Sequence, residues 1–195
     1  MLIRTKIIEA LKGDKIDQQV VVKGWVRTKR ESKNVVFINM NDGSTIKNLQ
    51  AVADPSGFDE ALWPQITTGS CLSITGKLVA SMGKGQTVEL IPETIEVLGK
   101  ADPERYPLQP KKHSFEFLRE KAHLRPRTNT FGAILRIRHA LIFAIHKYFN
   151  DKGFVNVHTP IITGSDAEGA GEMFQVTTLD LLNVPRTEEG KVDFS

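Results

Sequence analysis

The first hundred residues alternate between apolar and polar positions with the two-residue period of β-strands. Runs rich in β-branched residues, bounded by polar and turn-forming residues, predict five strands. The turn sequence Asn41-Asp42-Gly43-Ser44 separates the second strand from the third, and Gly83-Lys84-Gly85-Gln86 separates the fourth from the fifth. The predicted strands cover residues 19–29, 35–40, 46–53, 71–80 and 87–98.

Two helices complete this part of the pattern. Between the third and fourth strands, Phe58, Leu62 and Ile66 recur at helical spacing, which predicts a short helix interrupted at Pro64. A second helix is predicted at residues 5–11, before the first strand. Three strands, a short helix and two further strands are the layout of a five-stranded OB-fold β barrel.

Residues 99–127 differ in composition from the barrel that precedes them. Four prolines exclude a long helix, and eight basic against four acidic residues argue against a core element. We therefore predict a hinge or linker, with a short amphipathic piece at residues 115–118.

The hydrophobic period changes to that of a helix after residue 128. Apolar residues mark one broad face over residues 129–152, and Gly153 follows at the position of a C-terminal cap. A strand is predicted at residues 154–158, closed by Thr159-Pro160, and the last twenty residues have the pattern of a loop. The predicted division is a barrel domain at 1–98, a hinge at 99–127, and the start of an α+β domain at 128–195.

Composition excludes several classes of protein. The chain is 40% hydrophobic and 25% charged, as expected of a soluble globular protein. Its single cysteine, Cys71, excludes an internal disulfide framework and a cysteine-rich zinc site and favours the cytoplasm. No apolar run is long enough to suggest a membrane span or a secretion signal. The net charge of +3 is too small to prove a polyanionic partner.

Several motifs resemble class II aminoacyl-tRNA synthetases. The sequence from Phe149 to Ile162, a helix end followed by Gly-Phe, a predicted strand and a proline, resembles motif 1 of that class. Gly24-Trp25-Val26-Arg27, followed by Phe37 and Gln50, resembles the anticodon barrel of the aspartyl, asparaginyl and lysyl subgroup. Downstream segments look like the asparaginyl branch: residues 167–174, 178–180, 184–186 and 190–194.

This resemblance implies an activity that belongs to a longer enzyme. The reaction is the ATP-dependent attachment of asparagine to tRNA-Asn through asparaginyl-adenylate, with Mg²⁺ offsetting phosphate charge. The two later motifs of the class, which hold ATP, do not occur here. We therefore expect no catalytic residue, no bound cofactor and no activity in these 195 residues. The alternatives are an aspartyl-tRNA synthetase and a free-standing OB-fold binder of tRNA.

The resemblance also assigns roles on the barrel. Phe37 would stack on the central uridine of the anticodon, Gln50 would pair with a uracil edge, and Glu89 would accept from the guanine-type first base. Arg30 would contact a base or a phosphate. On the pattern alone, a core position is the better explanation of Phe37. Solvated strand positions explain Gln50 and Glu89 equally well, and a free surface charge explains Arg30. Trp25 is interpreted as core.

Other roles lie beyond the barrel. Glu168, within a glycine-rich loop, matches the residue that holds the ammonium group of the amino acid. The broad apolar face of the helix predicts a homodimer contact through motif 1; packing within the same chain is the alternative, and one face can serve both. His139, His146 and His158 lack metal-ligand partners at useful spacing, so no metal site is predicted. The residues assigned to the dimer contact are Phe149, Gly153, Phe154 and Pro160.

Overall fold

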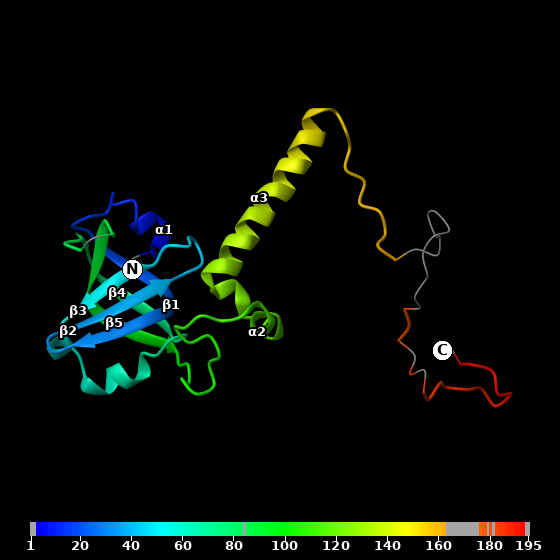
Figure 1. Cartoon of the computed structure of the whole chain (residues 1–195), viewed down its shortest axis with the longest axis horizontal. Coiled ribbons are helices and arrows are strands. Elements are labelled where there is room, and N and C mark those ends of the chain that lie inside the picture. The colour runs from blue at the N-terminus through cyan, green and yellow to red at the C-terminus, as the bar shows by residue number, and fades with distance from the viewer. Residues whose placement is uncertain (1–2, 84, 163–175, 179, 181, 194–195) are drawn as a thin grey trace. The chain divides into compact units, whose positions relative to one another are not determined.

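The barrel closes through a single order of hydrogen-bonded strands (Figure 1). The computed structural model describes residues 3–83, 85–162, 176–178, 180 and 182–193. Within them the strand order is β1-β2-β3-β5-β4, with β4 returning to β1. Of the ladders between these described strands, only that of β3 with β5 is parallel. The strands are β1 (Gln19–Ser32), β2 (Val35–Asn41), β3 (Leu49–Ala53), β4 (Cys71–Ala80) and β5 (Val88–Gly99). The predicted five-stranded OB fold is confirmed.

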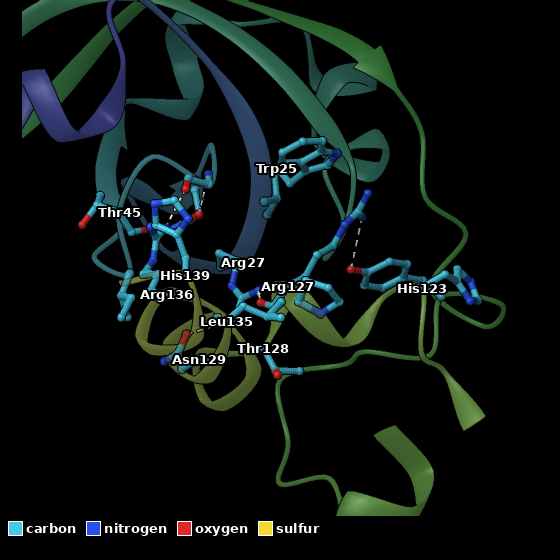
Figure 2. A pocket seen from close by; sticks show the side chains of 17 residues that line it. Trp25, Arg27, Thr45, His123, Arg127, Thr128, Asn129, Leu135, Arg136 and His139 are labelled. Atoms are coloured by element: carbon cyan, nitrogen blue, oxygen red, sulfur yellow. Dashed lines mark hydrogen bonds between the residues drawn. The ribbon is translucent and has the colours of Figure 1, made fainter. Parts of the chain in front are cut away.

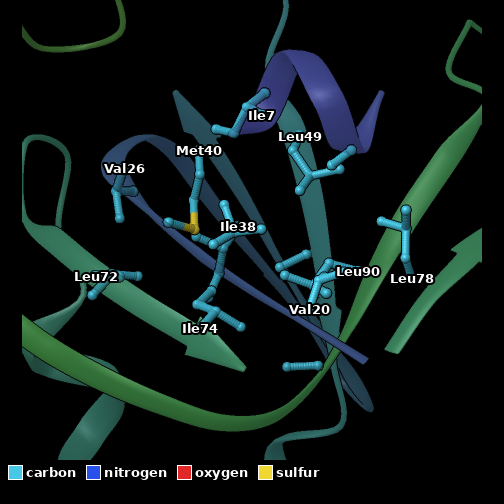
Figure 3. Close-up of a cluster of buried hydrophobic side chains, with 14 of the residues drawn as sticks. Ile7, Val20, Val26, Ile38, Met40, Leu49, Leu72, Ile74, Leu78 and Leu90 are labelled. Atoms are coloured by element: carbon cyan, nitrogen blue, oxygen red, sulfur yellow. The ribbon is translucent and has the colours of Figure 1, made fainter. Parts of the chain in front are cut away.

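Alternating apolar side chains fill the inside of this barrel (Figure 3). Along β2 and β3 every second residue is buried, as a strand with one face on a core requires. The short helix α1 (Ile7–Ala10) adds Ile7 and Ala10 to the same core, both fully buried. The core residues drawn with labels are Ile7, Val20, Val26, Ile38, Met40, Leu49, Leu72, Ile74, Leu78 and Leu90.

Several predicted elements differ in extent from the structure; β1, for example, continues to Ser32 rather than ending at residue 29. The helix expected at residues 5–11 is limited to α1, and β3 begins at Leu49 rather than at residue 46. The Asn41 side-chain amide explains the later start, because it donates to the carbonyls of Thr45 and Lys47 at 3.0 Å each and holds that segment in a loop. The helix before β4 is two 3₁₀ turns, η1 (Pro55–Gly57) and η2 (Glu60–Gln65), since Pro64 lacks the N–H that a continued α-helix needs.

The segment between β5 and α3 contacts the barrel through a hydrogen bond and a packed aromatic ring. The Thr67 hydroxyl donates to the carbonyl of Ala101 at 2.5 Å, and the Tyr106 ring packs so closely on Gly69 that a Cβ there would lie 2.8 Å from it. The predicted amphipathic piece is α2 (Phe115–Glu120), and the long helix is α3 (Asn129–Asp151), preceded by η3 (Arg125–Arg127). No helix in the described part of the chain is both long and apolar enough to cross a bilayer.

Two features of the C-terminal part concern earlier predictions. Residues 154–158 are not a strand, because they have no ladder partner among the described residues and a strand is defined by those hydrogen bonds. Contacts divide the chain into compact units 1–147 and 148–195. The division at 98/99 and 127/128 remains a prediction, since compact units need not coincide with family boundaries.

Asp42 ties α1 to the turn between β2 and β3. Its carboxylate accepts from the backbone N–H of Ile7 at 3.0 Å, from the N–H and hydroxyl of Ser44 at 3.0 and 2.5 Å, and from Arg4 at 3.3 Å. Burial acts to raise the pKa of Asp42, but these hydrogen bonds and the Arg4 charge outweigh it and hold the pKa below its usual value.

We expect Asp42→Asn to lower the free energy of unfolding by about 1–2 kcal/mol, because an amide presents a donor where the carboxylate accepts. The lowered pKa stabilises the fold above the unfolded value of about 4, and this contribution is lost as pH falls through the folded value. The difference between the two proteins should therefore shrink below about pH 4, measured by urea unfolding.

Asp54 supplies the matched control. It accepts from the N–H and hydroxyl of Ser56 in the same arrangement, but it is exposed and these bonds stay within its own turn. Asp54→Asn should have the smaller effect on stability. An equal loss in both variants would contradict the role given to Asp42.

Candidate nucleic-acid interface

Side chains from four neighbouring strands gather on the outside of the barrel. In β2, Phe37 and Asn39 point outward because Ile38 between them is fully buried. Residues directly opposite each other in a ladder share a face, and the register pairs Arg30 with Phe37 and Asn39 with Gln50. We name this surface the outer strand face; it comprises Arg30, Phe37, Asn39, Gln50 and Glu89.

Glu89 joins the surface through hydrogen bonds. Its Oε1 accepts from the Gln50 amide at 3.2 Å and from the Ser81 hydroxyl at 3.0 Å. The Gln86 amide donates to the same oxygen. This network fixes a carboxylate and an amide side by side, and such a pair can read the hydrogen-bonding edges of bases.

Phe37 lies outside the barrel core. It is half-buried and does not belong to the cluster of buried residues. Its cross-strand neighbour Arg30 is exposed, so an aromatic surface and a guanidinium stand together on the outer strand face. Both groups are of the kind that binds single-stranded nucleic acid, by base stacking and by phosphate neutralisation. The individual roles of Arg30, Phe37, Gln50 and Glu89 remain predictions.

Asn39 of this face and its cross-strand neighbour Thr28 were not assigned a role from the sequence. The Asn39 amide donates to the Thr28 hydroxyl at 3.0 Å, and Asn39 lies between Phe37 and Gln50. Its two-residue spacing from Phe37 was a usable signal. The position of Thr28 could not be predicted, because a β-bulge between Val26 and Thr28 breaks the alternation along β1.

Trp25 is not a core residue, and its interpretation as one is wrong. Its side chain is 38% exposed, and the guanidinium of Arg127 lies over its ring at 4.8 Å from the centroid. A cation packed on an aromatic face stabilises this arrangement without full burial. The partner lies a hundred residues away in the chain, so the local pattern gave no sign of it.

The motif 1 region ends α3 with a defined cap. Gly153 has a positive φ of 86°, its N–H donates to Asn150 at 3.0 Å, and the N–H of Phe154 donates to Phe149 at 3.1 Å. This is a left-handed glycine cap of the kind predicted. The rings of Phe149 and Phe154 meet edge to face at 5.5 Å, yet the two residues are 49% and 65% exposed. Pro160 is also exposed.

Neither the amino-acid site nor an ATP site can be built from the described residues. Glu168 lies outside them. Where the structure describes the chain, no three His, Cys, Asp or Glu side chains gather as a metal ion would require. The resemblance implies ATP and Mg²⁺ for a longer enzyme, but no described residue of this chain is assigned to bind either of them.

Two family models match separate parts of the sequence. Residues 20–98 match the OB-fold nucleic acid binding domain, and residues 114–183 match the class II tRNA synthetases of the D, K and N group. The first match covers the barrel strands, and the second contains α2 and α3.

Curated relatives match almost the whole chain. An asparagine–tRNA ligase of Cytophaga hutchinsonii is 63% identical over 98% of this chain, and one of Porphyromonas gingivalis is 59% identical over 98%. These matches cover 42% and 41% of the two relatives, so the chain spans about two-fifths of their length.

Solved structures share the fold at low identity. The asparaginyl-tRNA synthetase of Pyrococcus horikoshii, complexed with asparaginyl-adenylate, has a TM-score of 0.79 at 23% identity, over 92% of this chain and 42% of that one. A putative aspartyl-tRNA synthetase of Leishmania major has a TM-score of 0.69 at 18% identity, over 82% and 34%.

Proposed function

Because this chain belongs to the asparaginyl-tRNA synthetase family, we propose that it supplies anticodon recognition to an enzyme that attaches asparagine to tRNA-Asn. The outer strand face carries this proposal, since it places a half-buried aromatic ring, a guanidinium and a hydrogen-bonded Gln50–Glu89 pair on one surface of an OB barrel. Single-stranded bases are bound by stacking on such rings and by hydrogen bonds to their edges.

Each residue of the outer strand face has a distinct role in this proposal. Phe37 stacks on the central uridine, and Gln50 pairs with its edge as donor and acceptor. Glu89 accepts from the N1 and N2 donors of the first base. The bonds that Glu89 already accepts from Gln50 and Ser81 hold its carboxylate in place before the RNA arrives. Arg30 neutralises a phosphate or contacts a base.

The longer enzyme would act in two steps. The carboxylate of asparagine attacks the α-phosphorus of ATP and releases pyrophosphate, and the terminal ribose hydroxyl of tRNA then attacks the acyl carbon and releases AMP. Glu168 would hold the ammonium group of asparagine, since opposite charges attract strongly away from water. Mg²⁺ would offset phosphate charge, and no residue of this chain is assigned to it.

We also propose that the enzyme is a cytoplasmic homodimer. On α3, Leu141 is 58% exposed, Phe143 66% and Ile145 57%, besides the aromatic pair Phe149 and Phe154. Apolar surface on this scale favours burial against another subunit or another part of the same enzyme.

Amino-acid-dependent exchange of pyrophosphate into ATP tests the proposal. The full-length protein should catalyse this exchange with asparagine and not with aspartate. The 195-residue chain should catalyse neither exchange, because the two later motifs of the class, which hold ATP, do not occur in it. Exchange with aspartate alone would identify an aspartyl enzyme. No exchange by the full-length protein, with binding of the anticodon stem-loop retained, would identify a free-standing RNA-binding module.

A further inference from the structure

A basic pocket separate from the outer strand face lies beside Trp25 (Figure 2). It has a volume of about 750 Å³ and is formed by β1, the turn after β2, the segment before α3 and the first turns of α3. Three arginines and two histidines line it, and the lining includes no aspartate or glutamate. The basic residues are Arg27, His123, Arg127, Arg136 and His139.

Arg27 reaches this pocket because of an irregularity in β1. The ladder to β2 shifts between Val26 and Thr28, so Arg27 is the extra residue of a β-bulge, a feature that redirects side chains. Its guanidinium donates to the carbonyl of Arg127 and, at 3.4 Å, to the side-chain oxygen of Asn129. Burial lowers the pKa of Arg27, and the charge of Arg127 lowers it further, against an opposing effect of Tyr106.

The other two arginines also bind uncharged groups. Arg127 lies over the Trp25 ring and within 3.5 Å of the Tyr106 hydroxyl, and Arg136 donates to the carbonyl of Gly43 at 2.6 Å. Among the described residues, none of the three forms an ion pair. Arg27 and Arg127 are half-buried, whereas Arg136 is exposed at the edge of the pocket. Positive charge drawn partly out of water without a counter-charge is costly, so an anion bound beside Arg27 and Arg127 would be stabilised.

We infer that this pocket binds the phosphate group of a nucleotide. Arginine forks match the geometry of phosphate oxygens, and the start of the 23-residue helix α3 at Asn129 adds a positive helix end beside them. The volume exceeds the needs of a phosphate alone. The Trp25 ring with Ile46 and Leu135 offers apolar surface for a nucleoside. The nucleotide could be free or part of an RNA chain.

Two arginines two positions apart on α3 provide a matched test. Both are exposed, but Arg136 lines the pocket and Arg138 does not. Inorganic phosphate, AMP and a tRNA-Asn transcript are titrated by calorimetry into the 195-residue chain and into Arg136→Gln and Arg138→Gln. Loss of one charge-assisted contact should weaken binding roughly tenfold in Arg136→Gln and leave Arg138→Gln unchanged.

The ligands distinguish the two sources of phosphate. Weaker binding of AMP and phosphate in Arg136→Gln supports a free nucleotide, and weaker binding of the tRNA alone supports a nucleotide of the RNA. Equal affinities of the two variants for all three ligands would overturn the inference. A second variant, Arg27→Gln, must weaken binding of the same ligand, and circular dichroism checks that this variant is folded. The isolated anticodon stem-loop should bind all variants equally, because it contacts the outer strand face. A negative result for this pocket therefore leaves the proposed anticodon recognition untouched, and the reverse also holds.

Discussion

Replacing Phe37 by alanine is expected to weaken binding of the tRNA-Asn anticodon stem-loop by roughly ten- to a hundredfold while the barrel stays folded. Removal of an aromatic stacking platform costs about 1–3 kcal/mol per base. The fold should tolerate the change because Phe37 is half-buried on the outer strand face and lies outside the buried core. Fluorescence anisotropy of a labelled stem-loop measures the affinity, and thermal unfolding measures the stability.

Phe115→Ala is the matched control, since it removes the same side chain from a 52%-exposed position on α2, outside the barrel. The affinity of this variant for the stem-loop should stay within about twofold of that of the unmodified protein. A Phe37→Ala protein that unfolds, yet binds normally in its folded fraction, would assign Phe37 to packing and remove the stacking platform from the proposal.

The barrel could be predicted because its information is local. Alternation within each run identified the buried side of a strand, and the predicted strand at residues 71–80 coincides with β4. The outward direction of Gln50 and Glu89 followed from the same alternation. Prolines and glycines marked the ends of elements equally well, as the positive φ of Gly153 after α3 illustrates.

Pairings between distant segments could not be predicted from local pattern. The hydrogen bond from Gln50 to Glu89 joins β3 to β5 in the one parallel ladder of the described barrel, and nothing near either residue specifies that neighbour. The same reason explains the error at Trp25. An aromatic residue in a strand usually packs inward, but here Arg127 covers its outer side.

Two further differences have separate physical causes. The bulge that redirects Arg27 is a property of the β1–β2 register, which no single strand encodes. The segment at residues 154–158 has the β-branched and aromatic composition of a strand, but composition gives only a propensity, and pairing needs a neighbour. The described part of this chain does not supply one.

Gly76→Ala is expected to destabilise the barrel by about 3 kcal/mol or more, the larger of the stability effects predicted here. A Cβ on Gly76 would lie 2.1 Å from the carbonyl oxygen of Ile91 and 2.9 Å from the Cα of Pro92. These are backbone atoms of the neighbouring strand, so no side-chain rotation can relieve the overlap. The ladder between β4 and β5 would have to separate at this point.

The need for glycine at this position follows from Pro92. Proline has no N–H to give to a ladder and is tolerated within a sheet at bulges. The register between β4 and β5 shifts at Thr75/Gly76, so that Gly76 faces Pro92 across an irregular step where the strands approach closely. Glycine inside a strand usually weakens it, but at this position the close approach of Ile91 and Pro92 leaves no room for a Cβ.

Gly57→Ala is the control for the chemical change itself. An added Cβ there meets nothing within 4 Å, so its effect should stay within about 0.5 kcal/mol. Urea unfolding followed by circular dichroism measures both variants, and the loss in Gly76→Ala corresponds to a lowering of Tm on the order of 10 °C. Comparable stability of the two variants would show that β4 and β5 can part at Gly76 without cost, which would contradict the close approach on which this prediction rests.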